Sequence, residues 1–398
     1  IFLSAVMAVS VTTSAFAEEP QPTGSITMQN SAGGTKTNSS YSAYQVVKFN
    51  ASLLDGKTVY TDMKLNPDYK NAIIDSIGSS LSSSSSDEDV LSEMEKLKDD
   101  ATETAALAVA LKGVTPSDED FVYSTATNGV FNNLPYGYYL VIETANNAND
   151  GTVISKPILV GVPEKDVEAI TDDVNVIVKT SKATIEKKIV ETDPDNSAKT
   201  ILVDSNTAAF GDTIRYQSTS TFPTYSSDST GITYYVTDTF SNGLQFNQNG
   251  GIDSVEVVDN DDNQIKSLTD SNTDNTYYQL TYTTLPDSSE TTFKLELQGD
   301  SKDDNIKAWG NEGYKLVIKY HATLTGDVNF GNIGNPNSIR LTYSNKPGSA
   351  DDTYTTPDDT VITYTNKLVI TKTDSTNSSK KRHFAMLPLP PITSCRSQ

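Results

Sequence analysis

The segment TIEKKIV, residues 184–190, alternates in the manner of a β-strand with one face in a core. Ile185, Lys187 and Ile189 share the mostly apolar face, so this face is expected to point inward and to carry the lysine with it. A strand bulge would exchange the two faces and bring Lys188 inward instead. The segment therefore predicts a β-domain with a lysine side chain in its core.

Two later segments bring further polar side chains onto apolar faces. In YYVTDTFSNGL, residues 234–244, alternation places Asp238 among apolar side chains. In IRLTYSNKP, residues 339–347, it places Asn345 on the face of Ile339 and Leu341. An acid, an amide and a lysine are thus predicted to enter one core.

Burial of these groups favours amide chemistry. An unpaired buried charge is costly, so the lysine shifts toward the neutral amine and the carboxylate toward the neutral acid. The amine of Lys187 can attack the side-chain carbonyl of Asn345, with Asp238 as the proton shuttle, to leave a Lys–Asn isopeptide bond and ammonia. Such a step happens once per chain, so the chain is predicted to cross-link itself and not to be an enzyme. The alternative is an ordinary Lys187–Asp238 ion pair with Asn345 capping a turn.

Composition indicates an exported protein. Residues 1–17 form an apolar run ending in AFA, which predicts a secretory signal truncated at its start. The chain has one cysteine, Cys395, so disulfides are not expected to stabilise it. A net charge of −22 argues against nucleic acid and anionic lipid as partners. Apart from the removed signal, no membrane segment is expected.

The pattern of short strands predicts an all-β chain of tandem immunoglobulin-like sandwiches with a helical insertion in the first. The predicted boundaries are 18–182 for the first sandwich, 183–366 for the middle one and 367–398 for an incomplete third domain with an aberrant tail. Helical spacing marks the insertion through four apolar residues, Val90, Leu91, Met94 and Leu97.

An ordered set of motifs resembles the backbone subunits of sortase-assembled Gram-positive pili, which are isopeptide-forming fimbrial proteins. The resemblance spans about residues 24–379. It rests on SYSAYQVVKF, LPYGYYLVIET, TIEKKIVE, FGDTIRYQ, VTDTFSNGLQFN, GNPNSIRLTYSNKP and LVITKTD.

The resemblance implies collagen-adhesin-type (CnaB) sandwiches with internal isopeptide bonds. It assigns the bond-forming lysine to the EKK strand, the acid to Asp238 and the acceptor to Asn345. The implied function is the structural shaft of a cell-wall-anchored pilus. Its implied partners are a sortase, identical subunits joined head to tail and a host surface ligand. No cofactor and no metal are implied.

Further residues are assigned by the same resemblance. The acceptor lysine for polymerisation is Lys179, with Lys182 as the alternative, although a YPK-like motif is replaced here by IVK. Lys372 resembles the lysine of an isopeptide site in the incomplete third domain. Glu143 resembles an acidic partner, but the first strand carries no lysine before Lys36, so no bond is expected in the first sandwich. The family's LPXTG-type sorting signal is not found in this sequence, and LPLPP does not qualify as one.

Two other functions can be weighed against the composition. A monomeric surface adhesin or glycan-binding protein would use the many Tyr and Asn residues. A histidine-based enzyme is disfavoured because His321 and His383, the two histidines, fall in different predicted domains.

Overall fold

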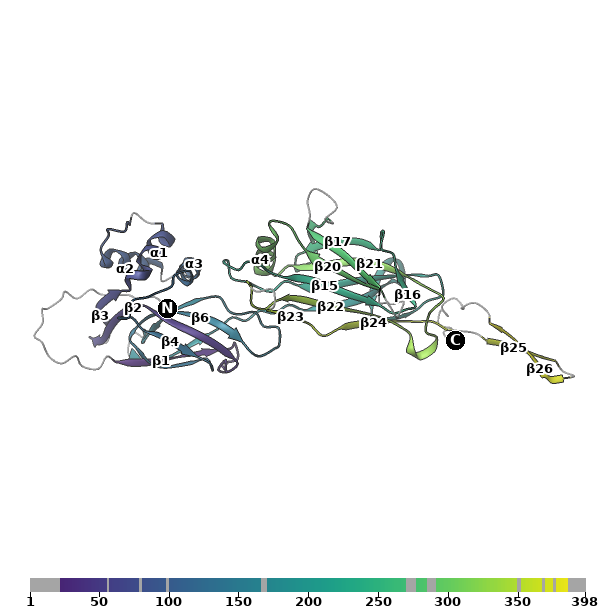
Figure 1. The fold of residues 1–398 in the computed structure, drawn as a ribbon, viewed down its shortest axis with the longest axis horizontal. Helices are drawn as coiled ribbons and strands as arrows, with labels where there is room; N and C mark the ends of the chain where they lie inside the picture. Colours follow the sequence, from purple (N-terminus) through teal and green to yellow (C-terminus); the bar gives the residue numbers. More distant parts are fainter. Residues whose placement is uncertain are drawn as a thin grey trace, which may run out of the picture. The chain divides into compact units, whose positions relative to one another are not determined.

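The computed structural model describes residues 22–385 apart from 56, 79–80, 98–99, 166–169, 270–276, 285–290, 349–351, 367–368 and 375–376. The predicted signal region and the residues after 385 therefore lie outside the described residues. The chain divides into two compact units, which comprise residues 1–181 with 225–228 and residues 182–224 with 229–398 (Figure 1). No helix in the described ranges is long and apolar enough to cross a membrane.

The first unit contains two main sheets. The smaller sheet has the order β10–β1–β5, with β1 parallel to β10 and antiparallel to β5. The larger sheet has the order β3–β2–β6–β7, and β4 pairs with β2. The strands of these sheets are β1 (Thr23–Gln29), β2 (Ser39–Leu54), β3 (Lys57–Leu65), β4 (Tyr123–Ala126), β5 (Val130–Pro135), β6 (Gly137–Asn146), β7 (Ile158–Val162) and β10 (Asp173–Ile177), while β8 (Glu164–Lys165) and β9 (Ile170–Thr171) form a separate pair.

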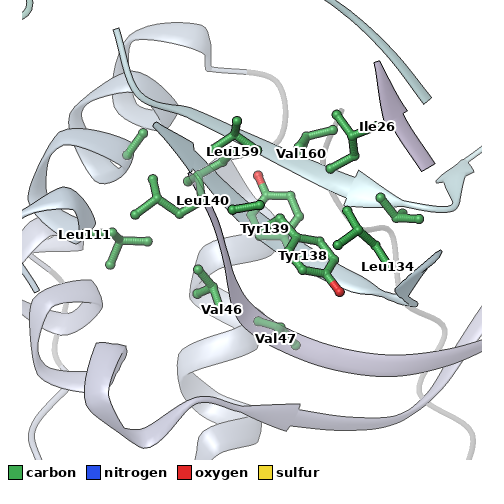
Figure 2. Packing of buried hydrophobic residues seen from close by; sticks show 14 of the residues in the cluster. Ile26, Val46, Val47, Leu111, Leu134, Tyr138, Tyr139, Leu140, Leu159 and Val160 are labelled. Carbon is green, nitrogen blue, oxygen red and sulfur yellow. The ribbon is translucent and has the colours of Figure 1, made fainter. Parts of the chain in front are cut away.

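Burial in the first unit follows the layers of the fold. Strand β1 alternates, with Ile26 and Met28 turned into the core. In β6 the residues from Gly137 to Val141 are all buried, as expected for a strand covered on both faces. Leu111, which belongs to a helix packed on β6 and β7, joins the same hydrophobic cluster (Figure 2).

The predicted helical insertion consists of three helices, α1 (Pro67–Ile77), α2 (Asp87–Lys96) and α3 (Ala101–Lys112). Helix α2 begins with a capping box between Ser86 and Asp89. It buries Val90 and Met94, two of the apolar residues that predicted it. The sequence reading missed α1, whose start is marked by an Asn66 cap followed by proline at the first helical position.

The second unit contains two seven-stranded sheets. The first has the order β12–β11–β14–β21–β17–β18, with β16 on β21. Its strands are β11 (Ile185–Asp193), β12 (Asn196–Val203), β14 (Thr213–Thr221), β16 (Leu244–Phe246), β17 (Ile252–Val258), β18 (Gln264–Ser267) and β21 (Lys315–Leu324). The second has the order β13–β24–β22–β15–β20–β19, with β23 on β22. Its strands are β13 (Ser205–Thr207), β15 (Tyr234–Phe240), β19 (Tyr278–Thr284), β20 (Thr291–Leu297), β22 (Asn335–Ser344), β23 (Thr353–Thr355) and β24 (Asp359–Tyr364).

Alternating burial shows which faces of these sheets form the core. Every second residue of β15 from Tyr234 to Phe240 is buried, and β14 shows the same alternating burial pattern. Helix α4 (Lys302–Glu312) adds the buried Ile306 and Trp309, and a short 3-10 helix spans Gly331–Ile333. A hairpin of β25 (Val369–Asp374) and β26 (Asn377–Ala385) follows. The predicted all-β fold with a helical insertion is confirmed.

Candidate functional site

Lys187 projects from β11 into the core of the second unit, and its side chain is fully buried. Its Cα is paired with that of Ser218 in β14. Strand β12 pairs with β11 only from Ile189 onward, so it provides no partner for the backbone N–H of Lys187. That N–H donates instead to the Asp359 carboxylate of the opposite sheet at 2.6 Å. The backbone of Lys187 is thus held by β14 in its own sheet and by Asp359 in the opposite sheet.

Asp238 meets the lysine from the opposite sheet. It lies in β15 between Phe293 of β20 and Ile339 of β22, and its side chain is fully buried. The Nζ of Lys187 donates a hydrogen bond to Oδ2 of Asp238. A third polar group, the hydroxyl of Tyr320 in β21, accepts from Nζ at 2.7 Å and donates to the same Oδ2 at 2.6 Å.

Aromatic rings enclose this polar cluster. The Nζ of Lys187 lies 4.8 Å from the ring centre of Tyr216, 5.0 Å from that of Tyr320 and 5.7 Å from that of Phe240. The rings of Tyr216 and Tyr320 are stacked with their centres 5.5 Å apart. The rings exclude water from the cluster, and this burial disfavours the charged forms of Lys187 and Asp238, although the ring faces themselves attract a cation.

Burial shifts both ionisable partners toward their neutral forms. It lowers the pKa of Lys187 from 10.5 to about 8, against the opposing effect of the Asp238 charge. Burial likewise raises the pKa of Asp238, although hydrogen bonds from Lys187 and Tyr320 act in the other direction. A neutral amine beside a protonated acid is the combination that amide formation needs.

Asn345 is not brought to this pair. It lies just beyond the end of β22, is half-buried, and donates its backbone N–H to the carbonyl of Asp352 at 3.2 Å. The register pairs Asp238 with Ile339. Extended backbone from Ile339 to Asn345 covers roughly 20 Å, because each residue of a strand rises about 3.3 Å.

A different asparagine lies beside the acid. Asn337 belongs to the inward face of β22, is paired with Phe240 of β15, and is 1% exposed. Within the described part of the chain, neither side-chain atom of Asn337 has a hydrogen-bond partner, and the same is true of Oδ1 of Asp238. The Asn337 amide nevertheless lies near enough to counteract the burial-induced rise in the pKa of Asp238.

The sequence contained a signal for Asn337 but not for Tyr320. Alternation along β22, continued one residue past its end, puts Asn337 and Asn345 on one face, and only the strand register distinguishes them. Tyr320 lies on the apolar face of YKLVIKYHATL, between Ile318 and Ala322, where a tyrosine is ordinary core material. Its proximity to the lysine depends on β14 lying between β11 and β21.

The remaining predicted lysines lie elsewhere. Lys188 faces outward and pairs with Glu186 at 3.0 Å and Asp204 at 2.7 Å. Lys179 and Lys182 are both exposed, in the segment between β10 and β11. Lys372 lies in β25, and its side chain is outside the described ones.

The first unit holds a second buried lysine–acid pair. Glu143 of β6 is buried and accepts from Lys36 Nζ at 3.1 Å and from the backbone N–H of Ser155 at 2.6 Å. No asparagine amide is among the hydrogen-bond partners found for this pair in the described residues. The geometry is that of an ion pair that connects β6 to the segment after β1.

Among the described residues, no group of three or more His, Cys, Asp or Glu side chains is arranged to hold a metal ion. His321 is paired with Asp253 at 2.9 Å on the surface of β21.

No protein-family model and no curated protein sequence matches this chain. Solved structures do match it. The T6 backbone pilin of serotype M6 Streptococcus pyogenes shares 19% sequence identity at a TM-score of 0.50, over 91% of this chain and 68% of that one. The chain has the backbone-pilin fold. The fimbrial protein FimP from Actinomyces oris matches at the same TM-score with 14% identity, over 90% of this chain and 72% of FimP.

The backbone-pilin fold agrees with the resemblance found in the sequence motifs. At these identities the comparison concerns the fold, while the cluster of Lys187, Asp238 and Tyr320 is an observation on this chain's own side chains.

Proposed function

We propose that this chain is an extracellular shaft subunit of a covalently polymerised pilus, stiffened by an isopeptide bond within its second unit. The observation that carries the proposal is the fully buried Lys187–Asp238 pair next to the Asn337 amide, which has no hydrogen-bond partner among the described residues. The backbone-pilin fold, shared with the T6 backbone pilin and with FimP, supports it.

The acceptor in this proposal is Asn337, in place of the Asn345 expected from the sequence. The neutral Nζ of Lys187 attacks Cγ of Asn337, the bond from Cγ to the amide nitrogen breaks, and ammonia leaves with one proton from Nζ. Asp238 donates a proton to the amide during the step and recovers one from the amine, so it is unchanged at the end.

The bond would connect the two sheets of the sandwich. Lys187 lies in β11 of one sheet and Asn337 in β22 of the other, with about 150 residues between them. A covalent link between the sheets would resist their separation under tension, which suits a subunit of a fibre.

Mass measurement of the intact chain tests the bond. We expect the wild-type chain to be lighter than its sequence by the mass of one ammonia, and a proteolytic digest to contain a branched peptide that joins Lys187 to Asn337. The variant Asn337→Ala should retain the full mass. Asn345→Ala is the matched control and should still lose ammonia. Loss of ammonia in Asn337→Ala but not in Asn345→Ala would restore Asn345 as the acceptor.

Polymerisation requires an exposed lysine that a sortase can join to the next subunit. Lys179 and Lys182 both satisfy this requirement in the segment between β10 and β11. Lys179 is the preferred acceptor because it holds the position of the pilin lysine in the motif resemblance. Anchoring to a cell wall and contact with a host surface ligand are part of the same proposal.

A sortase assay separates this function from that of a monomeric adhesin. Full-length protein that carries its sorting signal, incubated with its sortase, should form ladders that resist sodium dodecyl sulfate. Lys179→Ala should abolish the ladder and Lys182→Ala should leave it unchanged. A chain that stays monomeric in every case, yet binds glycans, would favour the adhesin.

A further inference from the structure

Tyr320 takes no part in the proposed cross-linking step as described so far, yet it contacts both ionisable groups of that step, Lys187 and Asp238. Its hydroxyl is buried, accepts a hydrogen bond from Nζ of Lys187 at 2.7 Å and donates one to Oδ2 of Asp238 at 2.6 Å. The ring is fixed by stacking on Tyr216 and by an edge contact with Phe293, whose centre is 5.3 Å away.

The two oxygens of Asp238 have different surroundings. Oδ2 accepts hydrogen bonds from both Nζ of Lys187 and the hydroxyl of Tyr320. Oδ1 has no partner within the described residues, and neither has the amide of Asn337. An oxygen that already accepts two donors is a poor site for a further proton, so the acid proton belongs on Oδ1.

The same contacts orient the amine. A neutral amine has two N–H donors and one lone pair. The two donors of Lys187 are used by Oδ2 and by the hydroxyl of Tyr320. Its lone pair is then left for the Asn337 carbon.

We propose that Tyr320 is a positioning residue for the cross-linking step, which directs the proton of Asp238 to Oδ1 and the lone pair of Lys187 toward Asn337. This inference rests on the proposed isopeptide bond. In that step Oδ1–H donates to the Asn337 carbonyl oxygen while Nζ bonds to its carbon. Ammonia then leaves with one proton from Nζ, and the hydroxyl of Tyr320 keeps its own proton throughout.

The titratable groups around Asp238 define the expected pH dependence. Three of them act on Asp238 directly: Lys187 on β11, Tyr216 on β14 and Tyr320 on β21. The fourth, Asp359 on β24, acts on Lys187 and Tyr320. Burial and the Asp238 charge hold the pKa of Tyr320 well above 10, so its hydroxyl remains a donor. The pKa of Asp238 is raised by burial, and donation from Tyr320 opposes that rise. Removal of the hydroxyl should therefore raise this pKa further.

The experiment follows the reaction in time with the variant Tyr320→Phe. The full chain is purified in denaturant from insoluble material, so that it has not yet folded or reacted. It is then refolded by dilution at a series of pH values, and the loss of ammonia is followed by intact-mass measurement. We expect Tyr320→Phe to form the bond at least about tenfold more slowly than wild type. We also expect the alkaline limb of its rate profile to move to higher pH. The matched control is Tyr234→Phe, which removes another buried hydroxyl, bonded to Ser220 at 2.8 Å, and should react like wild type.

The outcomes separate this inference from the proposed function. If wild-type chain never loses ammonia, the isopeptide bond and the role of Tyr320 fail together. If wild type reacts and Tyr320→Phe has the same rate and profile, only the role of Tyr320 is refuted. A slower rate with an unshifted alkaline limb also refutes it, because a loss of packing alone would slow the reaction without changing the acid.

Discussion

Replacing Asn337 with alanine is expected to lower the free energy of unfolding of the second unit by about 5 kcal/mol. The Asn337 amide has no hydrogen bond of good geometry among the described residues, so its own contribution to stability should be small beside that of the cross-link. The loss comes from the missing cross-link, because closing a loop of about 150 residues restricts the unfolded chain by about 5 kcal/mol in the chain-entropy treatment. Urea unfolding followed through the fluorescence of Trp309, the chain's one tryptophan, measures this unit.

The pH dependence of the same variant provides a second check. Without the bond, Lys187 titrates with a pKa of about 8 in the folded chain against 10.5 when unfolded. Between these values the unfolded state binds the additional proton, so the stability of Asn337→Ala should rise with pH relative to wild type. In wild type the proposed bond would convert the amine into an amide, which does not titrate. Asn345→Ala should match wild type in both experiments, and equal stability of all three proteins would contradict the cross-link.

The variant Asp238→Ala is expected to be less stable still. It removes the acid needed for the bond, and it also leaves Lys187 buried without its carboxylate. Loss of one partner of a buried pair typically costs about 3–5 kcal/mol. The variant should therefore keep its full mass and unfold with about 3 kcal/mol less free energy than Asn337→Ala.

Neither Asp238→Ala nor Asn337→Ala can form the proposed bond. The difference between their free energies of unfolding therefore reports the contribution of the Lys187–Asp238 pair alone. Urea unfolding at neutral pH, again read through Trp309, gives the difference directly. Equal stability of the two variants would show that the lysine relieves its burial by another route, and loss of ammonia from Asp238→Ala would exclude the aspartate as the proton shuttle.

Strand alternation correctly predicted two of the three polar side chains expected in the core, whereas Asn345 is only half-buried beyond the end of β22. It placed Lys187 and Asp238 inside the second unit and left Lys188 outside, and the side chains lie in those positions. Alternation has a period of two residues and contains no information on register. The sequence analysis chose Asn345, and only the pairing of Asp238 with Ile339 shows that Asn337 is the asparagine beside the acid.

The contact between Tyr320 and Lys187 could not be predicted from alternation either, because alternation contains no information on strand order. The contact of Tyr320 with Lys187 requires that β14 be the strand between β11 and β21, which follows from how the whole sheet is ordered. Helix α1 was missed although Tyr69, Ile73 and Ile77 recur in it at helical spacing. Its capping signal was local and readable, whereas the sheet order was not.

The position of β24 in the chain has a mechanical consequence. This strand follows Asn337 in sequence and pairs with β22 and with β13. A tether from Lys187 to Asn337 would shield about 150 residues from a pulling force, but the stretch that ends in β24 would remain in the line of tension. Peeling away those roughly 30 residues would release on the order of 100 Å of slack before the covalent link is stretched. The chain would then behave as a stiff link with a short extensible segment at one end, which could lengthen under a sudden force and recover when β24, β23 and the end of β22 pair again.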